Sequence, residues 1–278
     1  MLNQMTCTLI ISTYNRPDAL RLCLLSAINQ SLLPSEIIIG DDGSREETAK
    51  VIDEIRAISP VPIVHVWQED SGFRLAKMRN KCVVAAKGEY IIECDGDIIL
   101  HRHFVRDHMS MAKRGHYLKG GRVNLGKELT DKLCAKGEKA KVGFFTPGVE
   151  AKRENSLYMP RFARMIAPYY RRHKESALGC NMSFFKDDFF AINGYDEYYV
   201  GWGGEDIDFG RRLQRNGLSK LHLKFAGIVF HLWHEDKFMY NKDQNLEHSK
   251  RIDEQQPVRC RDGADKYLSP DGEAIIIK

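Results

Sequence analysis

The chain has 278 residues, 43% of them hydrophobic and 29% charged, which suits a globular protein large enough to bury a full core. No run approaches the roughly eighteen apolar residues that a membrane-spanning helix needs. The opening MLNQMTCTLIIST lacks the layout of a signal peptide, so the expected location is the cytoplasm. The seven cysteines include no CxxC pair, so neither a disulfide framework nor a cysteine zinc site is indicated.

The net charge of +4 is unevenly spread along the chain. Residues 111–175 contain sixteen Lys or Arg against six Asp or Glu, so the remainder is net negative. A basic block of this kind indicates a partner that carries phosphate, an anionic membrane surface, or only a solvated lysine-rich face. Nucleic acid is disfavoured as the partner because the block holds no recognisable reading motif.

Strands alternate with helices in the first part of the chain. The apolar periodicity predicts, in order, strand 5–13, a helix from Pro17, strand 36–40, helix 46–58, strand 63–67, helix 75–86 and a strand leading into Asp95. Alternation of this kind implies a parallel sheet with right-handed crossovers, and therefore an α/β fold.

Polar side chains follow four successive strands of this predicted sheet. They are Ser12 to Tyr14, Asp41 with Asp42, Gln68 with Glu69, and Asp95 with Asp97. In an open α/β sheet the carboxyl ends of parallel strands share one edge, and this edge is where ligands bind. No GxGxxG follows the first strand and no GxxxxGK[ST] occurs, so ordinary dinucleotide and P-loop phosphate binding are disfavoured.

Asp95 and Asp97 are separated only by Gly96. Two carboxylates this close repel each other unless a divalent cation, a set of hydrogen-bond donors or a pKa shift intervenes. The glycine lets the backbone turn and lets a bulky ligand approach. The alternative is that Asp-Gly marks only a turn.

Four segments carry a family resemblance: STYNRP (12–17), IIIGDDGS (37–44), MRNKCVVAAKGEYI (78–91) and CDGD (94–97). Through them the sequence resembles the GT-A enzymes of glycosyltransferase family 2. The resemblance implies a Rossmann-like, mostly parallel central sheet flanked by helices in a single domain, and sugar transfer from a nucleotide sugar. It also implies that Ser12 and Tyr14 contact a uracil-type base, Asp42 accepts its ring N–H, Arg16 and Arg79 lie near the donor, Asp95 binds the ribose and Asp97 is the metal ligand.

Residues 101–176 are the least informative part of the chain. His101, His103 and His108 lie close together, but HRHFVRDH favours the exposed start of a helix over a metal site. The segment KGGRVN (119–124) predicts a strand. Residues 126–176 favour a plain helix pair, although their aromatic, Met and Arg side chains leave open a flexible lid or a surface for a lipid-linked acceptor.

A second distinctive stretch is WGGED (202–206), which opens a helix continued by residues 209–217. Glycines permit close approach of a sugar, tryptophan offers an apolar ring, and a helix N-terminus stabilises ionised acids. The alternative is that the acids merely cap the helix. The stretch resembles the motif of β-1,4-galactosyltransferase-like and chondroitin-polymerase-like transferases, although Ile207 stands where the galactosyltransferases usually have an acid. That resemblance implies Asp206 as the catalytic base and an acceptor site shaped by Trp202, Gly203, Gly204 and Glu205.

The remaining predicted strands are 177–184 and 224–230, followed by a helix at 247–256. In such transferases a histidine after the last core strand completes the metal site. His231 aligns best with that position, and His234 is the alternative. Imidazole with carboxylate and diphosphate oxygens suits Mn²⁺ better than Mg²⁺.

These features predict a metal-dependent, inverting glycosyltransferase that moves a hexosyl or N-acetylhexosaminyl group from a UDP-sugar to a hydroxyl of a glycan or lipid-linked glycan. Bacterial surface polysaccharide is the implied product, and the inner membrane is an implied partner through peripheral contact. The expected GT-A domain, 1–240, divides into a nucleotide-sugar half (1–110), a basic insert (111–176) and an acceptor half (177–240), before a helix and tail (241–278).

Two other functions stay open. A sugar nucleotidylyltransferase also uses a parallel sheet and a carboxylate-bound metal, but its expected Gly-rich, basic loop after the first strand is not what STYNRP provides. A nucleotide- or carbohydrate-binding module without catalysis is the other alternative, and the presence of Asp97, Asp206 and His231 argues against it.

Overall fold

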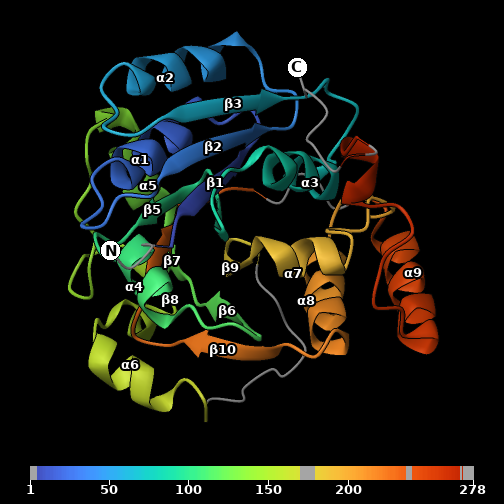
Figure 1. Ribbon diagram of the computed structural model, residues 1–278. Coiled ribbons are helices and arrows are strands. Elements are labelled where there is room, and N and C mark those ends of the chain that lie inside the picture. Colours follow the sequence, from blue (N-terminus) through green and yellow to red (C-terminus); the bar gives the residue numbers. More distant parts are fainter. Residues whose placement is uncertain (1–4, 170–178, 236–239, 270, 272–278) are drawn as a thin grey trace.

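The computed structural model describes residues 5–169, 179–235, 240–269 and 271. Its main feature is a seven-stranded sheet in the order β10-β6-β9-β4-β1-β2-β3 (Figure 1). The strands are β1 (Cys7–Thr13), β2 (Glu36–Asp41), β3 (Ile63–Trp67), β4 (Tyr90–Asp95), β6 (His116–Gly120), β9 (Asn181–Phe185) and β10 (Ser219–Leu223). β1, β2, β3 and β4 run parallel, whereas β9 is antiparallel to both of its neighbours, β4 and β6. The expected α/β fold with a mostly parallel sheet is confirmed.

Helices cover both faces of this sheet (Figure 1). The helices of the described residues are α1 (Pro17–Ala27), α2 (Glu46–Arg56), α3 (Leu75–Ala85), α4 (Phe104–Met111), α5 (Lys127–Lys136), α6 (Pro160–Ile166), α7 (Lys186–Ala191), α8 (Glu205–Arg215) and α9 (Lys242–Gln255), with short turns η1 (Arg153–Ser156) and η2 (Ala264–Tyr267). Leu9 and Ile11 of β1 pack in the same core cluster as α1 and α2, whereas Ile10 packs with α3. All three side chains are fully buried, as expected for a parallel strand covered on both sides.

A smaller four-stranded sheet has the order β5-β11-β7-β8. Its strands are β5 (Ile98–Leu100), β7 (Val123–Leu125), β8 (Val149–Ala151) and β11 (Val229–His231). β11 pairs antiparallel with β5, which sets His231 opposite Ile98. Because β5 begins directly after Asp97, this pairing brings a histidine from late in the chain beside the acidic turn.

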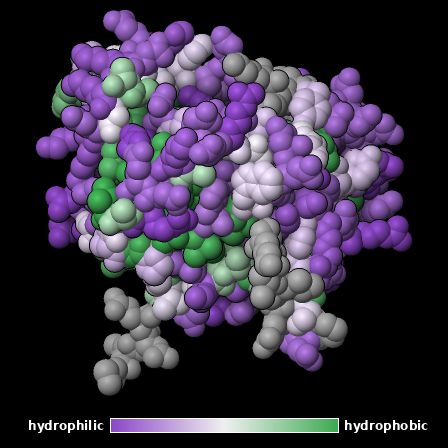
Figure 2. All heavy atoms as spheres, turned by 90° about the horizontal axis from the view of Figure 1, so that it is seen from above, coloured by the Kyte–Doolittle hydropathy of each residue, from purple (hydrophilic) through white to green (hydrophobic). Residues whose placement is uncertain are grey.

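The face of the molecule over α2 and β3 is mainly hydrophilic. Figure 2 shows hydrophilic side chains over most of this face, with hydrophobic ones visible as a band between them. The buried residues of α2 include Val51, Ile52 and Ile55, which share one side of the helix and leave its charged side outward. None of the helices in the described part of the chain combines the length and apolar character needed to cross a bilayer.

Several local predictions differ from the structure. The expected strand 119–124 is wrong, because β6 ends at Gly120 and β7 begins at Val123, so the chain passes there from the larger sheet to the smaller one. The expected strand 224–230 begins only at Val229, because Phe225 before it adopts a φ of +66°. The helix that the acidic pair was predicted to open does begin at that pair, at Glu205.

The middle of the chain also departs from expectation. In place of a plain helix pair, β8 and η1 lie between α5 and α6, and residues 170–176 fall outside the described residues. His108 is fully buried rather than exposed, with ring nitrogens 2.7 Å from Ser183 Oγ and 3.1 Å from Asn181 Oδ1. Of the expected strand 177–184, the first two residues are not described, and β9 starts at Asn181.

Candidate active site

The acidic turn between β4 and β5 is tightly packed against β1. The backbone N–H of Gly96 donates to the carbonyl of Ser12 at 2.7 Å. A Cβ at Gly96 would lie 3.0 Å from that carbonyl oxygen and 3.1 Å from the Cβ of Thr13, so the turn favours glycine. The Leu232 N–H donates to the carbonyl of Asp97 at 2.9 Å, which ties the segment after β11 to the same turn.

Asp97, His231 and His234 form a group of possible metal ligands, with one ligand atom from each residue all within 4.8 Å of one another. His231 Nε2 lies 3.6 Å from Asp97 Oδ1, and His234 Nε2 lies 3.3 Å from Asp97 Oδ2. Burial lowers the pKa of His231 despite the opposing charge of Asp97, so its ring is neutral near pH 7 and able to ligate a metal. Both candidate histidines therefore reach the same carboxylate.

This group fits a divalent cation. Asp97 Oδ1 is buried and, among the described residues, accepts no hydrogen bond, so the carboxylate keeps a free acceptor inside the group. One carboxylate and two imidazoles form a mixed oxygen and nitrogen donor set, which suits Mn²⁺ better than Mg²⁺. Arg16 is also present here, with Nη1 2.9 Å from Asp97 Oδ2 and Nη2 3.1 Å from the carbonyl of Trp233.

The residues expected to hold the nucleotide base lie at the ends of β1 and β2. Asp42 is 3% exposed and accepts hydrogen bonds from Gln68 Nε2 at 2.5 Å and from the Arg74 N–H at 2.7 Å. Burial raises the pKa of Asp42 above its ordinary value. The hydroxyl of Tyr14 donates to Asp70 Oδ2 at 2.8 Å. Asp70, which directly follows the polar pair Gln68 and Glu69 after β3, therefore belongs to this group.

Arg79 joins the two halves of the candidate site. Its side chain is 2% exposed, with Nη2 3.2 Å from Asp95 Oδ1 and Nη1 3.4 Å from Glu205 Oε1. Burial raises the pKa of Asp95 to about 6 and that of Glu205 to about 7, and the nearby charge of Asp206 adds to both shifts. Acids separated by more than a hundred positions in the sequence thus share one electrostatic environment.

The WGGED residues lie at the start of α8. The Gly179 N–H donates to Asp206 Oδ2 at 3.2 Å. Trp202 is 45% exposed, and Lys242 Nζ lies 5.5 Å from the centre of its ring. Gly203 and Gly204 have φ angles of +87° and +105°, which L-residues rarely adopt, and a Cβ at Gly204 would lie 2.5 Å from Tyr199 Cε1. The observed N-cap is Gly204, with no side-chain capping hydrogen bond.

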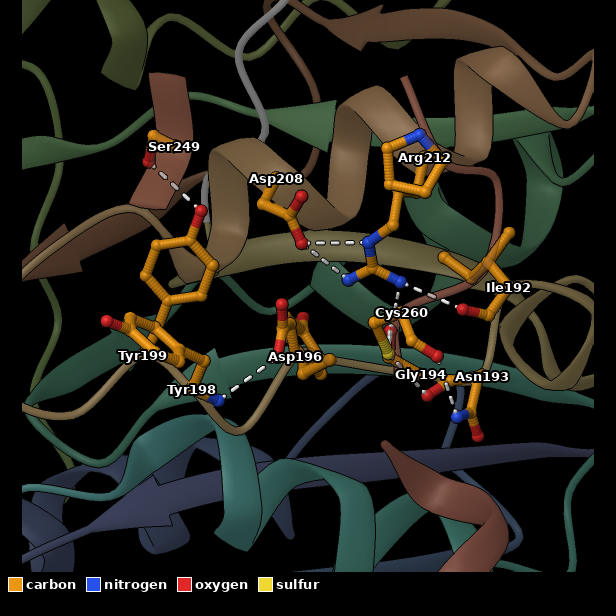
Figure 3. Close-up of polar contacts among 12 residues, drawn as sticks. Ile192, Asn193, Gly194, Asp196, Tyr198, Tyr199, Asp208, Arg212, Ser249 and Cys260 are labelled. Atoms are coloured by element: carbon orange, nitrogen blue, oxygen red, sulfur yellow. Dashed lines mark hydrogen bonds and ion pairs between the residues drawn. The ribbon is translucent and has the colours of Figure 1, made fainter. Parts of the chain in front are cut away.

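A buried ion pair supports α8 from below (Figure 3). Arg212 and Asp208, one turn apart on the helix, are 1% and 3% exposed and lie 2.7 Å apart. The remaining Arg212 donors reach the carbonyls of Ile192 at 2.9 Å and Gly194 at 2.6 Å (Figure 3). This cluster fixes α8 to the segment of Ile192 and Gly194. It does so without Arg79 or Gly179, the residues that contact Glu205 and Asp206.

Sequence reasoning missed two charged residues near the acids. Arg122, at the passage between the sheets, is close enough to offset the raised pKa of Asp95 and to contribute to the lowered pKa of His231. Glu93, inside β4, is 1% exposed and accepts the hydroxyl of Tyr195 at 2.5 Å. The only signal for Arg122 was its place in the basic block, and no signal marked Glu93.

Comparison with known proteins agrees with this arrangement. The model of glycosyl transferase family 2 matches residues 8–190, and that of the N-terminal domain of galactosyltransferase matches residues 160–235. The chondroitin synthase of Escherichia coli is 27% identical over 227 residues, which cover 76% of this chain and 32% of that protein. The chain thus spans less than two thirds of this relative.

Solved structures show the same fold at low sequence identity. GalNAc-T7 with UDP, GalNAc and Mn²⁺ gives a TM-score of 0.62 at 17% identity, covering 91% of this chain and 48% of the other. A mannosyltransferase from Pyrobaculum calidifontis with GDP-Man and Mn²⁺ gives 0.59 at 14% identity, covering 92% and 63%. The fold is therefore of the GT-A type. Because the family 2 model matches most of the chain, from residue 8 to residue 190, the chain belongs to glycosyl transferase family 2.

Proposed function

We propose that this chain is a metal-dependent, inverting glycosyltransferase that moves a hexosyl or N-acetylhexosaminyl group from a UDP-sugar to a hydroxyl of a glycan or lipid-linked glycan. The acceptor class is bacterial surface polysaccharide. The observation that carries the proposal is the position of Arg79, 3.2 Å from Asp95 and 3.4 Å from Glu205. Donor-side and acceptor-side acids within reach of one guanidinium set the two substrates next to each other.

Asp206 is the proposed base. It lies in the first turn of α8, at the positive end of the helix dipole, and the Gly179 N–H donates to one of its oxygens. As the acceptor oxygen attacks the anomeric carbon, its proton passes to the Asp206 carboxylate and the bond from that carbon to the diphosphate oxygen breaks. Attack from the face opposite the leaving group inverts the anomeric centre. Glu205 and Trp202, with Gly203 and Gly204, shape the acceptor side.

On the donor side, we assign the base and ribose to Ser12, Tyr14, Asp42 and Asp95, following the family resemblance. Asp97, with His231 and His234, would hold Mn²⁺ or Mg²⁺, which when bound neutralises charge on the departing diphosphate. The free buried oxygen of Asp97 and the neutral ring of His231 support this assignment. Arg16, beside Asp97, adds positive charge on the same side.

UDP is the proposed nucleotide on the strength of the motif resemblance. The two solved relatives differ here, one holding UDP and the other GDP-Man, each with Mn²⁺. A thermal-shift panel of UDP- and GDP-sugars with and without Mn²⁺ separates the two, because a ligand that binds only the folded state raises the melting temperature. A larger shift with GDP-sugars would overturn the choice of UDP.

The experiment that tests the activity is nucleotide release from UDP-sugars, with and without acceptor glycans, for the wild type and for Asp206→Asn. We expect the variant to bind donor normally but to lose transfer by about 10²- to 10⁴-fold, the usual contribution of a general base. The exposed Asp187→Asn is the matched control, because its side chain is 82% exposed. Tight UDP binding without turnover, even with acceptors, would instead favour a binding module.

The outer face of α6 mixes apolar and basic side chains. Phe162 and Met165 are 42% and 61% exposed, and each follows an exposed arginine, Arg161 or Arg164, while Tyr169, three residues after the helix ends, is 82% exposed. We propose that this face contacts anionic lipid peripherally at the cytoplasmic side of the inner membrane, where a lipid-linked acceptor would lie. Arginines attract anionic headgroups, while exposed Met and aromatic side chains gain by entering the interfacial region.

Vesicle sedimentation tests this contact. The protein should pellet with phosphatidylglycerol-containing vesicles and not with pure phosphatidylcholine, and the double variant Phe162→Ser/Met165→Ser should lose most of that binding. Ile58→Ser is the matched control, because Ile58 is 64% exposed at the far side of the molecule, after α2. No binding to either vesicle, or equal binding by the double variant, would contradict the proposal.

A further inference from the structure

The loop that carries Trp202, residues 200–204, has no regular secondary structure to stabilise its conformation. Gly201, Gly203 and Gly204 have φ angles of +80°, +87° and +105°, and no regular strand or helix spans this loop. Glycine backbones with positive φ lose more conformational entropy on ordering than other residues do. The loop therefore depends on contacts from elsewhere in the chain.

Those contacts come from α9 and the residues just before it. Asn245 is 3% exposed, and its amide nitrogen donates to the carbonyls of Val200 at 3.1 Å and Trp202 at 3.2 Å. The Trp202 N–H donates in turn to the carbonyl of Tyr240 at 3.2 Å. One buried side-chain amide thus satisfies two loop carbonyls on either side of Gly201.

Further along α9, two more side chains hold the segment that leads into this loop. Ser249 Oγ lies 3.0 Å from the hydroxyl of Tyr199, a contact shown in Figure 3. His248 Nε2 lies 2.9 Å from Asp196 Oδ2. Side chains of α9 therefore contact the segment from residue 196 to residue 202 along its length. Asn245 binds the last part of that segment, which has no regular secondary structure.

We propose that Asn245 is a positioning residue for the acceptor. It fixes the loop backbone and, through it, the Trp202 ring against which the acceptor sugar packs. This inference rests on the proposed function, because it takes Trp202 as part of the acceptor site. Asparagine suits the position because its amide group supplies two N–H donors, whereas an aspartate of the same shape supplies none.

The reacting acids are held by other contacts. Glu205 is within 3.4 Å of Arg79, Asp206 accepts the Gly179 N–H, and α8 is fixed by the buried pair of Asp208 and Arg212. None of these contacts involves α9, and the ion pairs that join α8 to α9 run from Arg211 and Arg215 to Asp253, two turns beyond Asn245. Loss of the Asn245 amide should therefore disturb acceptor binding while leaving donor binding and donor hydrolysis nearly unchanged.

The test compares Asn245→Asp and Asn245→Ala with Leu246→Ala, a neighbour on the same helix that is 52% exposed. Both substitutions leave the partly buried carbonyls of Val200 and Trp202 without the Asn245 donor, so we expect an acceptor KM raised by about tenfold or more in both Asn245 variants. The KM for the nucleotide sugar and the rate of its hydrolysis without acceptor should stay within about twofold, and Leu246→Ala should match the wild type in every assay. A loss shared equally by donor and acceptor, or an unchanged acceptor KM, would overturn the proposal.

Hydrogen exchange provides a readout that does not depend on turnover. The N–H groups of Gly201 and Trp202, bonded to the carbonyls of Phe73 and Tyr240, should exchange faster in Asn245→Asp, whereas those of β1 and β4 should not change. If the wild type shows no transfer at all but this local effect appears, the proposed function fails while the role of Asn245 in holding the loop stands. Unchanged exchange in the loop would refute that role directly. If an Asn245 variant exchanges faster in every element, it is globally destabilised. Ser249→Ala, which removes only the Tyr199 contact, is then tested in its place, and we expect a smaller increase of exchange in the same loop.

Discussion

The proposed donor edge, at the ends of β1 and β4, and the proposed acceptor loop, residues 200–204, are held in place in different ways. At the donor edge, Ser12 and Asp95 sit at the ends of strands that are buried on both faces and hydrogen-bonded along their length. At the acceptor loop, Trp202 sits between glycines with positive φ and is held by the amide of Asn245. A sheet edge distributes its support over many backbone hydrogen bonds, whereas the loop concentrates it in a few side chains.

Single substitutions should therefore have different effects in the two regions. A change at a donor-edge side chain should remove a chemical function and leave the backbone in place, because the strands hold it. A change near the loop should move the backbone and alter affinity more than chemistry.

The largest effect is expected for Asp97→Ala. The carboxylate lies at the centre of the group with His231 and His234, so its loss should abolish Mn²⁺ binding and lower nucleotide release by about 10³-fold. Mn²⁺ titration followed by electron paramagnetic resonance, together with a UDP release assay, measures both. The melting temperature should stay near that of the wild type. A variant that still binds Mn²⁺ would place the metal elsewhere.

Glu93→Gln tests the contact between the two regions, because Glu93 on β4 accepts a hydrogen bond from Tyr195 in the other half. Burial raises the pKa of Glu93 from 4.5 to about 7, so the folded protein keeps a proton that the unfolded chain releases. The stability that this proton contributes is complete below pH 4.5 and is lost as the pH rises through about 7.

Denaturant unfolding at several pH values should therefore show Glu93→Gln gaining stability relative to the wild type as the pH rises from about 4.5 to 8, by about 3 kcal/mol at most. Glu69→Gln, at an exposed position after β3, is the control and should show no such trend. A difference that does not change with pH would mean that Glu93 is ionised throughout.

His231→Ala and His234→Ala separate the two histidines. His231 is 14% exposed and fixed by its pairing opposite Ile98, whereas His234 is 34% exposed and follows the strand. We expect the first substitution to weaken Mn²⁺ activation by about 100-fold and the second by about tenfold, a range usual for groups that hold or orient a metal. The reverse ranking would make His234 the principal ligand.

The smallest effect is expected from Gly204→Ala compared with Gly203→Ala. Both positions have positive φ, which costs roughly 1–3 kcal/mol for other residues, but only at Gly204 would the new Cβ approach Tyr199, at 2.5 Å. The acceptor KM should rise by about tenfold for Gly204→Ala and less for Gly203→Ala, with the donor KM unchanged in both. Equal increases of the acceptor KM in the two variants would show that backbone strain, and not the contact with Tyr199, causes the effect.

The donor edge could be predicted from the sequence because its signals are local. Apolar runs followed by polar residues mark buried strands and their ends, and this pattern located β1 to β4 and the turn at Asp95 and Asp97. The direction of β9 could not be predicted, because an apolar run has the same appearance in a parallel or an antiparallel strand. The passage from β6 to β7 was missed although its signal is local, since the Gly120-Gly121 pair inside KGGRVN is of a kind that often marks a turn.

The proposed acceptor side could be predicted from the sequence only in part. The unusual composition of WGGED marked it as a candidate site. In contrast, nothing in KDQNLEHSKR distinguishes the buried Asn245 from its exposed neighbours. His108 was misjudged for the same reason, because its partners Ser183 and Asn181 come from a distant strand. Burial of a lone polar residue depends on tertiary contacts, which a short sequence pattern does not contain.

Arg79 shows why charge alone does not define a residue in this protein. Its two terminal nitrogens diverge, one toward Asp95 and the other toward Glu205. A lysine would carry the same charge but end in a single nitrogen, which reaches one carboxylate and leaves the other to face its neighbours unscreened. The position requires a cation with two diverging nitrogen donors. An arginine-to-lysine exchange, harmless on most surfaces, would here break the ion pair to either Asp95 or Glu205.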